Sequence, residues 1–143
     1  MFIGEYSHNL DDKGRMAVPK KFRAALGKGT ILTKGFDACL CLYTKKEWEK
    51  ELEKHAASSP NQAAARALAR FTLASAMEVE SDAQGRIVLP EYLRIYAKLK
   101  KSVIVAGLYT RLEIWDEEAW RTYTARTDAQ SNEIAERVAE LEI

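Results

Sequence analysis

The chain carries one motif twice, and this internal repeat constrains its fold more than any other feature. The segment from Asp11 to Arg23 and the segment from Asp82 to Arg94 share the pattern Asp-x-x-Gly-Arg-x-x-x-Pro at a spacing of 71 residues. After a slip of one residue the similarity resumes at a spacing of 72. The matched positions there are Gly35, Leu40, Leu42, Tyr43 and Trp48, paired with Gly107, Leu112, Ile114, Trp115 and Trp120. Such a repeat indicates one small structural unit that occurs twice.

Each copy predicts a strand, a tight turn and a second strand, followed by a short helix. The turn falls at the Asp-x-x-Gly-Arg motif, where Gly14 and Gly85 can adopt a left-handed backbone conformation at little cost. Pro19 and Pro90 stand where the helix begins, because proline is well tolerated in a first helical turn. Both copies therefore predict the same local structure around the motif.

A β-hairpin and a second helix are expected after this unit in each copy. Strand-forming segments lead through turns near Gly35 and Gly107 into apolar strands. The segments expected to pair are 30–33 with 39–43, and 102–105 with 111–115. Thr44, three residues before Glu47, fits the start of a capping box, and Asp116 occupies the equivalent N-cap position.

Two helices are expected outside the repeated cores. Ser59-Pro-Asn-Gln62 fits a capping box with proline at the first helical position. Each helix carries an apolar stripe on one face. The stripe residues are Ala64, Leu68 and Phe71 in the linker helix, and Ile134, Val138 and Leu141 near the C-terminus. We expect both stripes to pack on the core, with contact between subunits as the alternative, since a short charged terminal helix is marginal unless it docks.

These elements predict a mainly β protein with helices, an α+β fold built from two tandem half-barrel motifs. The expected division is a first repeat over residues 5–52, a linker helix over 53–75, a second repeat over 76–121 and a C-terminal helix over 122–143. The composition, 47% hydrophobic and 30% charged, is typical of a soluble globular protein. No apolar run is long enough to cross a bilayer, and the first residues lack the pattern of a secretory signal, so we expect a cytoplasmic protein with no membrane partner.

The sequence offers little for catalysis or metal binding. Cys39 and Cys41 are the only cysteines, and residues two apart on a strand share a face, so we expect them to pack there as small side chains. The histidines, His8 and His55, lie far from any ligand-like spacing, and we expect no metal and no cofactor. There is no glycine-rich phosphate loop and no nucleophile with an evident base, so neither an enzyme nor a small-molecule substrate is expected. Turnover that depended on a specific Asp or His would favour an enzyme instead.

The two copies differ in charge although the chain as a whole carries only +1. From residue 7 to residue 23 five basic residues stand against two acidic ones, a local charge of +3. The matching window from residue 78 to residue 94 holds two basic and four acidic residues, a local charge of −2. Because DNA phosphates attract the first window and repel the second, the first copy is the better candidate for a DNA-binding surface.

The repeated motifs resemble those of the MraZ family, bacterial regulators of the division and cell-wall gene cluster. The resemblance rests on Met1-Phe-Ile-Gly-Glu-Tyr6, on Asp11-x-Lys-Gly-Arg15-x-x-x-Pro19 and on Asp82-x-x-Gly-Arg86-x-x-x-Pro90, and it covers essentially the whole chain. It implies AbrB-like swapped hairpins whose two copies form an intrachain pseudo-dimeric double-split β-barrel. It also implies a homo-oligomeric ring, associated with the nucleoid, that binds short direct repeats of double-stranded promoter DNA upstream of its own operon, usually as a repressor.

Within the first copy, Arg15 is the leading candidate for DNA contact. A guanidinium can bond guanine through two donors in the major groove or clamp a phosphate. Gly14 would let the backbone approach DNA closely. The remaining candidates are Lys13 for added charge, Lys20, Lys21 and Arg23 for phosphate contacts, and Asn9 for a base edge.

A structural role competes with DNA contact at several of these positions. An aspartate can accept hydrogen bonds from nearby backbone amides while arginine folds back onto its carboxylate. We expect this turn-stapling role for Asp11, Asp82, Arg86 and Gly85, because the acidic second copy keeps the same residues. Arg15 could do both, and Lys20 and Lys21 could simply form a solvated helix face.

A protein-interaction module is the alternative function, either a ring scaffold that does not bind DNA or an antitoxin-like partner. The half-barrel fold serves both purposes, so fold alone does not separate them. Salt-sensitive binding to a specific promoter sequence would distinguish a regulator from a scaffold.

Overall fold

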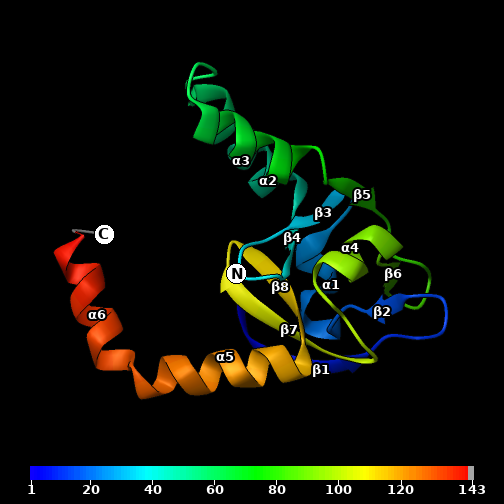
Figure 1. Cartoon of the computed structure of the whole chain (residues 1–143). Coiled ribbons are helices and arrows are strands. Elements are labelled where there is room, and N and C mark those ends of the chain that lie inside the picture. The colour runs from blue at the N-terminus through cyan, green and yellow to red at the C-terminus, as the bar shows by residue number, and fades with distance from the viewer. Residues whose placement is uncertain (142–143) are drawn as a thin grey trace.

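Six strands from both repeats form one antiparallel sheet. In the computed structural model, which describes residues 1–141, their order across the sheet is β1-β7-β8-β4-β3-β5 (Figure 1). The strands are β1 (Phe2–Asn9), β3 (Thr30–Lys34), β4 (Leu40–Tyr43), β5 (Met77–Val79), β7 (Ser102–Tyr109) and β8 (Arg111–Asp116). A separate two-stranded sheet pairs β2 (Arg15–Ala17) with β6 (Arg86–Val88).

The two repeats exchange strands to complete this sheet. The first strand of the first repeat, β1, pairs with β7 of the second repeat, and β5 of the second repeat pairs with β3 of the first. The equivalent strands β4 and β8 pair with each other at the centre, as do β2 and β6 in the small sheet. The expected α+β fold of two tandem repeats in a pseudo-dimeric arrangement is confirmed.

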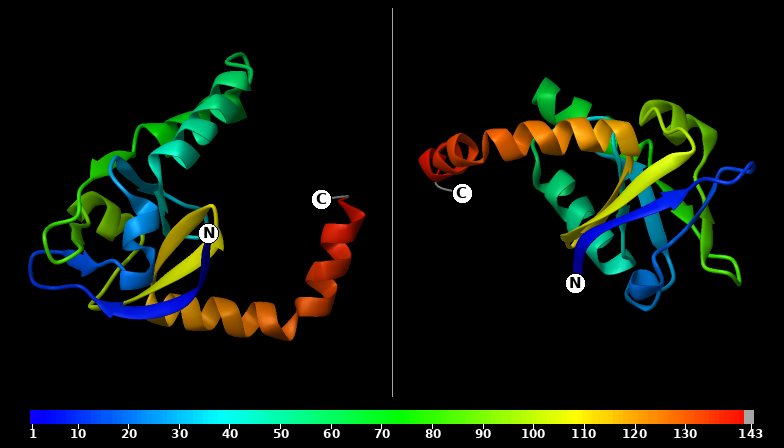
Figure 2. Two further views of the ribbon diagram at one scale, coloured as in Figure 1. Left: turned by 180° about the vertical axis from the view of Figure 1, so that it is seen from behind. Right: turned by 90° about the horizontal axis from the view of Figure 1, so that it is seen from below.

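Six helices surround the sheet within residues 1–141, and four of them form two projections. They are α1 (Lys20–Leu26), α2 (Lys45–Ala57), α3 (Ala63–Leu73), α4 (Glu91–Tyr96), α5 (Glu117–Ala129) and α6 (Ser131–Glu140). The hairpin of α2 and α3 projects from one side of the sheet, and α5 with α6 extends away from another (Figures 1 and 2). The predicted caps are confirmed, because Thr44 Oγ1 accepts from the Glu47 N–H and Asp116 Oδ2 accepts from the Ala119 N–H. Within residues 1–141, no helix combines the length and the apolar character needed to cross a membrane.

The main core is built from matched side chains of the two repeats. Fully buried pairs at equivalent positions are Met16 and Ile87, Val18 and Leu89, Phe22 and Leu93, and Leu42 with Ile114. Burial of each such side chain stabilises the fold by about 1.5–3 kcal/mol. The pleat of β4 places Leu40 and Leu42 in this core and directs Cys41 to the opposite face, where a second cluster of Cys39, Cys41, Tyr43, Trp48 and Trp115 forms. The expected packing of the two cysteines on one face is confirmed.

The predicted hairpin of 102–105 with 111–115 is confirmed, but its turn lies two to three residues after Gly107. Gly107 lies inside β7, opposite Gly4 of β1, and the hairpin reverses at Tyr109 and Thr110. A Cβ on Gly107 would stand 2.5 Å from the backbone nitrogen of Ile3. Glycine is therefore present for close approach of two strands, rather than for a turn.

The predicted start of the linker helix at Ser59 is wrong. The N-cap of α3 is Gln62, and Ser59 lies in the turn between α2 and α3. There the hydroxyl of Ser59 accepts a hydrogen bond from the Asn61 N–H, and the backbone carbonyl of Ser59 accepts one from the Gln62 N–H. These local bonds close a turn instead of capping a helix. The expected boundary between residues 52 and 53 falls inside α2.

The predicted packing of the apolar stripes on the core is correct only in part. In the linker helix Phe71 is half-buried and its ring stacks on that of Phe36, with 5.8 Å between the ring centroids, but Leu68 is exposed. Ile134 and Val138 on α6 and Leu141 at its C-cap are 36%, 41% and 63% exposed, because α5 carries α6 away from the sheet (Figure 1). The chain breaks direction at Gln130, and residues 142–143 of the expected C-terminal helix lie outside the described residues.

Candidate nucleic-acid interface

The first Asp-x-x-Gly-Arg turn is closed by its own aspartate. Asp11 Oδ1 accepts from the N–H groups of Lys13 at 2.9 Å and Arg15 at 2.8 Å, while Oδ2 accepts from Arg15 Nε at 2.6 Å. The pKa of Asp11 lies below its ordinary value, above all because the Arg15 N–H stabilises the carboxylate, with smaller contributions from the Arg15 side chain and the Lys13 N–H. The carboxylate thus fixes both the backbone of the turn and the direction of Arg15.

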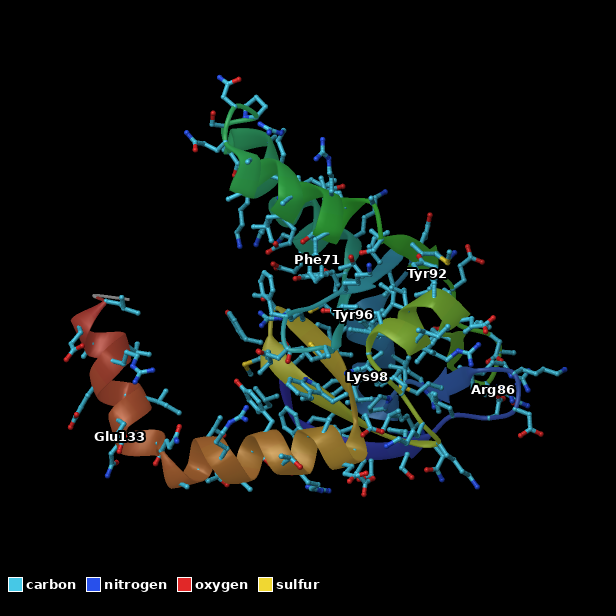
Figure 3. All side chains as sticks on the ribbon, in the orientation of Figure 1. Phe71, Arg86, Tyr92, Tyr96, Lys98 and Glu133 are labelled. Carbon is cyan, nitrogen blue, oxygen red and sulfur yellow. The ribbon has the colours of Figure 1, made fainter. Side chains whose placement is uncertain are left out.

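The second turn repeats this geometry. Asp82 Oδ1 accepts from the N–H groups of Gln84 and Arg86, both at 2.9 Å, and Oδ2 accepts from Arg86 Nε at 2.8 Å. The Arg86 N–H is again the main reason that the pKa of Asp82 lies below its ordinary value. Arg86 also reaches across to Asp11, with 3.9 Å between Nη1 and Oδ2. Both turns project from the same end of the molecule, opposite α6, as the positions of Arg86 and Glu133 in Figure 3 indicate.

Each turn is bonded through its glycine to the backbone of the other repeat, just after the short strand there. The carbonyl of Gly14 accepts from the Leu89 N–H at 2.9 Å, and the carbonyl of Gly85 accepts from the Val18 N–H at 3.0 Å. Gly14 and Gly85 have φ angles of +73° and +77°, which few other residues adopt without strain. The expected left-handed glycines are therefore part of a lock between the repeats.

Two arginines outside the turns complete this lock. Arg94 Nε donates to the Leu89 carbonyl at 2.8 Å, and its guanidinium covers Gly14, where a Cβ would stand 2.8 Å from Cζ. Arg23 makes the equivalent bond to the Val18 carbonyl at 2.9 Å and covers Gly85. Sequence reasoning assigned Arg23 only to phosphate and gave Arg94 no role, because the glycine that each arginine covers lies in the other repeat.

The first turn and the start of α1 carry three exposed lysines. Lys13 is exposed at the tip of its turn, and Lys20 and Lys21 are exposed at the start of α1. The side chain of Arg15 is 28% exposed. A guanidinium has five N–H donors, so the bond from Nε to Asp11 leaves the terminal nitrogens available to a ligand.

The equivalent positions of the second repeat carry different side chains. Gln84 replaces Lys13, while Glu91 and Tyr92 replace Lys20 and Lys21. The Tyr92 hydroxyl donates to the Ser75 carbonyl at 2.8 Å, which ties α4 to the end of α3. Arg86 is 31% exposed, nearly as much as Arg15, so the two turns differ in their neighbouring charges rather than in the access to their arginines.

Two further features border the first turn. The Leu10 N–H donates to the Lys101 carbonyl at 2.8 Å, which brings the basic segment 98–101 to the base of the turn. The run Lys-Leu-Lys-Lys was visible in the sequence, but only the pairing of β1 with β7 shows that it lies there. Asn9 is exposed, and its Oδ1 accepts from the Ser102 hydroxyl at 3.3 Å. Burial, followed by the charge of Arg23, lowers the pKa of His8, so this histidine adds little positive charge at neutral pH.

Comparison with known proteins places these features in one family. A family model described as "MraZ protein, putative antitoxin-like" matches residues 1–71 and again residues 72–141. Proteins named "Transcriptional regulator MraZ" are 48% identical in Desulforamulus reducens, with 99% of each chain covered, and 47% identical in Thermoanaerobacter pseudethanolicus, with 100% of each covered. Another of that name, from Caldanaerobacter subterraneus, is 46% identical, with 96% of each chain covered. This chain, with its two locked Asp-x-x-Gly-Arg turns, belongs to the MraZ family.

Proposed function

We propose that this chain is a DNA-binding transcriptional regulator that contacts promoter DNA through the turn of its first repeat. The observation that carries the proposal is the contrast between two turns with the same backbone bonds and different charges. Lys13, Lys20 and Lys21 surround Arg15, whereas the second turn has none of these lysines. A surface meant only to hold the fold together would not need the additional exposed cations.

Each first-repeat residue has a distinct role in this proposal. Arg15, aimed by Asp11, contacts a guanine edge or a phosphate with its terminal nitrogens. Lys13, Lys20 and Lys21 contact phosphates, which position the protein without specifying sequence. Gly14 is buried beneath the Arg94 guanidinium, so we assign it to closing the turn rather than to contact with DNA. Arg23 and Asn9 have partners within the fold, so their contribution to DNA binding is secondary.

The proposed regulator represses its own operon, which includes the division and cell-wall genes, and acts at the nucleoid in the cytoplasm. One chain offers few cations, and contacts of this kind give dissociation constants of roughly 10⁻⁴–10⁻⁶ M. A homo-oligomeric ring on short direct repeats would strengthen binding by ~10²–10⁴-fold through effective concentration. Subunits of such a ring would associate through the exposed apolar stripe of α6.

The decisive experiment compares equivalent substitutions in the two repeats. Duplex DNA from upstream of the chain's own gene is titrated with wild type, Arg15→Ala and Arg86→Ala, and binding is measured by fluorescence anisotropy. Both substitutions remove an Nε bond to the aspartate of the same turn, and Arg86→Ala also removes the longer contact with Asp11, so Arg86→Ala is the control for damage to the turns. Loss of a bidentate base contact costs about 1–3 kcal/mol, so Arg15→Ala should bind about 5–150-fold more weakly while Arg86→Ala binds nearly as wild type.

A charge exchange tests the role of the lysine without disturbing either turn. Only the N–H groups of Lys13 and Gln84 bond to the aspartates, so Lys13→Gln and Gln84→Lys leave the backbone bonds intact. Lys13→Gln should reduce the slope of log affinity against log salt concentration by about 1. Gln84→Lys should leave the slope for the promoter unchanged, because the proposal gives the phosphate contacts to the first turn.

Two results would count against the proposal. Equal losses of affinity in Arg15→Ala and Arg86→Ala would contradict a DNA contact confined to the first turn. Wild-type binding to the promoter no tighter than to scrambled duplex would favour the alternative, a ring scaffold or antitoxin-like protein-interaction module that uses the exposed apolar stripes.

A further inference from the structure

Two buried thiols and a carboxylate meet at the centre of the large sheet, far along the chain from the turns. Cys39 immediately precedes β4 and Cys41 lies within it, while Glu113 lies on the neighbouring strand β8. Cys41 and Glu113 are directly opposite each other in the register. The two sulfur atoms and a carboxylate oxygen of Glu113 all lie within 4.8 Å of one another.

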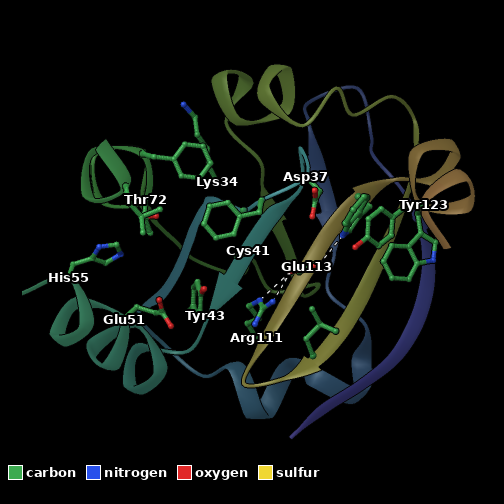
Figure 4. A pocket seen from close by; sticks show the side chains of 17 residues that line it. Lys34, Asp37, Cys41, Tyr43, Glu51, His55, Thr72, Arg111, Glu113 and Tyr123 are labelled. Carbon is green, nitrogen blue, oxygen red and sulfur yellow. Dashed lines mark hydrogen bonds and ion pairs between the residues drawn. The ribbon is translucent and has the colours of Figure 1, made fainter. Parts of the chain in front are cut away.

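The thiols converge on one point because the residue beside them has no side chain. Cys39 Sγ and Cys41 Sγ each lie 2.7 Å from the position that a Cβ on Gly35 would occupy. Cys39 is fully buried and Cys41 is 5% exposed, so neither sulfur is a surface group. Cys41 and Glu113 also line an open cavity of about 510 Å³, which gives an ion a path from solvent (Figure 4).

We propose that Cys39, Cys41 and Glu113 bind a thiophilic divalent cation of the zinc type, with the fourth ligand position open to the cavity. Tetrahedral zinc with Zn–S bonds of about 2.3 Å places two sulfurs about 3.8 Å apart, so the two sulfur atoms, which lie within 4.8 Å of each other, need to approach by at most about 1 Å. A disulfide fits less well, because residues two apart on a strand are about 6.7 Å apart at Cα, the upper end of the range that disulfides span. The spacing therefore favours a bridging cation over an S–S bond.

The surroundings of Glu113 suit a ligating carboxylate. Its Oε2 accepts from Arg111 Nη2 at 3.1 Å and its Oε1 accepts from Trp115 Nε1 at 3.0 Å, which fixes the orientation of the group. Metal-ligating carboxylates are commonly held by outer hydrogen bonds of this kind. On binding, each thiol releases its proton to solvent as a metal–sulfur bond forms. Two thiolates and one carboxylate then carry −3, which a divalent ion and Arg111 together neutralise.

Such an ion would join the two repeats at their central strand pair. Cys39 and Cys41 belong to the first repeat, and Glu113 occupies in the second repeat the position equivalent to Cys41. The site is independent of the proposed DNA contacts, since it shares no residue with the turns. Failure of either proposal would leave the other intact.

The test uses the reduced, metal-free full chain titrated with Co²⁺ and then Zn²⁺. Wild type should bind one equivalent of Co²⁺ with thiolate-to-metal charge-transfer absorption, and Zn²⁺ should displace it. Loss of outer-shell partners typically weakens metal binding 10–100-fold, so loss of a ligand in Cys41→Ser should weaken Zn²⁺ binding by at least about 100-fold. Glu113→Gln should weaken it by at least about 10-fold. Glu51→Gln is the matched control, because Glu51 lines the same cavity and should not affect affinity.

Thermal unfolding keeps the proposal testable if a cysteine variant fails to fold. Zn²⁺ should raise the Tm of wild type and of Glu51→Gln, reversibly on addition of a chelator, because a ligand that binds only the folded state stabilises it. The Tm of Glu113→Gln should rise much less. Absence of charge-transfer absorption in reduced wild type, or equal Zn²⁺ affinities of Glu113→Gln and Glu51→Gln, would overturn the proposal.

Discussion

Gly107→Ala is predicted to weaken the junction between the two repeats. Gly107 of β7 faces Gly4 of β1, and β1 pairs with β7 along its entire length. A Cβ at this position would stand 2.5 Å from the Ile3 nitrogen and 2.6 Å from the Phe2 carbonyl carbon. Both atoms belong to the backbone, so the clash can be relieved only if β1 moves away from β7.

The size of the effect follows from what must move. Overpacking of a well-packed interior typically costs about 1–3 kcal/mol and sometimes more. Because a strand rather than a side chain must shift, we expect Gly107→Ala to lower the free energy of unfolding by about 3 kcal/mol. For a domain of this size each kcal/mol corresponds to a Tm change of about 2–4 °C, so the Tm should fall by about 6–12 °C.

Gly27→Ala provides the control for the loss of a glycine. Gly27 has a φ of +65° and no heavy atom within 4 Å of the added Cβ, so only backbone strain is introduced. With a ψ of −152° Gly27 lies in a region that essentially only glycine occupies, and a side chain there costs about 1–3 kcal/mol, partly offset by lower entropy of the unfolded chain. Urea unfolding followed by tryptophan fluorescence, at one fixed protein concentration, measures both variants. The close-approach argument is refuted if Gly107→Ala is no less stable than Gly27→Ala.

Three further predictions follow from the turns and the projecting helix. Arg23→Ala and Arg94→Ala should each lower the free energy of unfolding in urea by about 1–2 kcal/mol. If Arg23→Ala instead bound DNA more weakly at unchanged stability, Arg23 would be a DNA contact rather than part of the lock. Asp11 and Asp82 have lowered pKa values when folded, so their stabilisation is present above about pH 4 and is lost as pH falls through the folded values. The free energy of unfolding of the double variant Asp11→Asn with Asp82→Asn should therefore fall less than that of wild type as the pH is lowered below about 4. Val138→Glu on α6 should leave the Tm nearly unchanged but reduce self-association in sedimentation, and an unaltered assembly size would contradict a role for the stripe.

Much of the local structure could be predicted because its causes lie within a few residues. The bonds from Asp11 to Lys13 and Arg15 span at most four residues, and the Thr44 cap spans three. The turn at Ser59 was misread for a related reason, since the same serine can cap a helix or close a turn and only the path of the chain decides.

Features that join the two repeats could not be predicted from local pattern. The lock between Gly14 and Arg94 connects residues far apart in the chain, and it exists only because β2 pairs with β6. The pairing of Gly107 with Gly4 could not be seen for the same reason, so the glycine was associated with the nearby hairpin turn rather than with the strand. Cys41 and Glu113 are likewise brought together only by the pairing of β4 with β8, which is why counting cysteines and histidines did not find the cation site proposed here.

The hydrogen bonds of the two turns explain why the net charge of each turn can differ between the repeats while the backbone geometry stays the same. In both repeats Asp accepts hydrogen bonds from backbone N–H groups, Gly meets a steric limit and the Arg side chain bonds the Asp carboxylate, so a change at any of them disturbs a contact of the turn. The position held by Lys13 or Gln84 contributes only its N–H to the same bonds, and its side chain is exposed in both cases. A duplicated chain can therefore concentrate positive charge on one turn at little cost to stability. An assembly of identical single-motif subunits would have to place the same side chain on every turn.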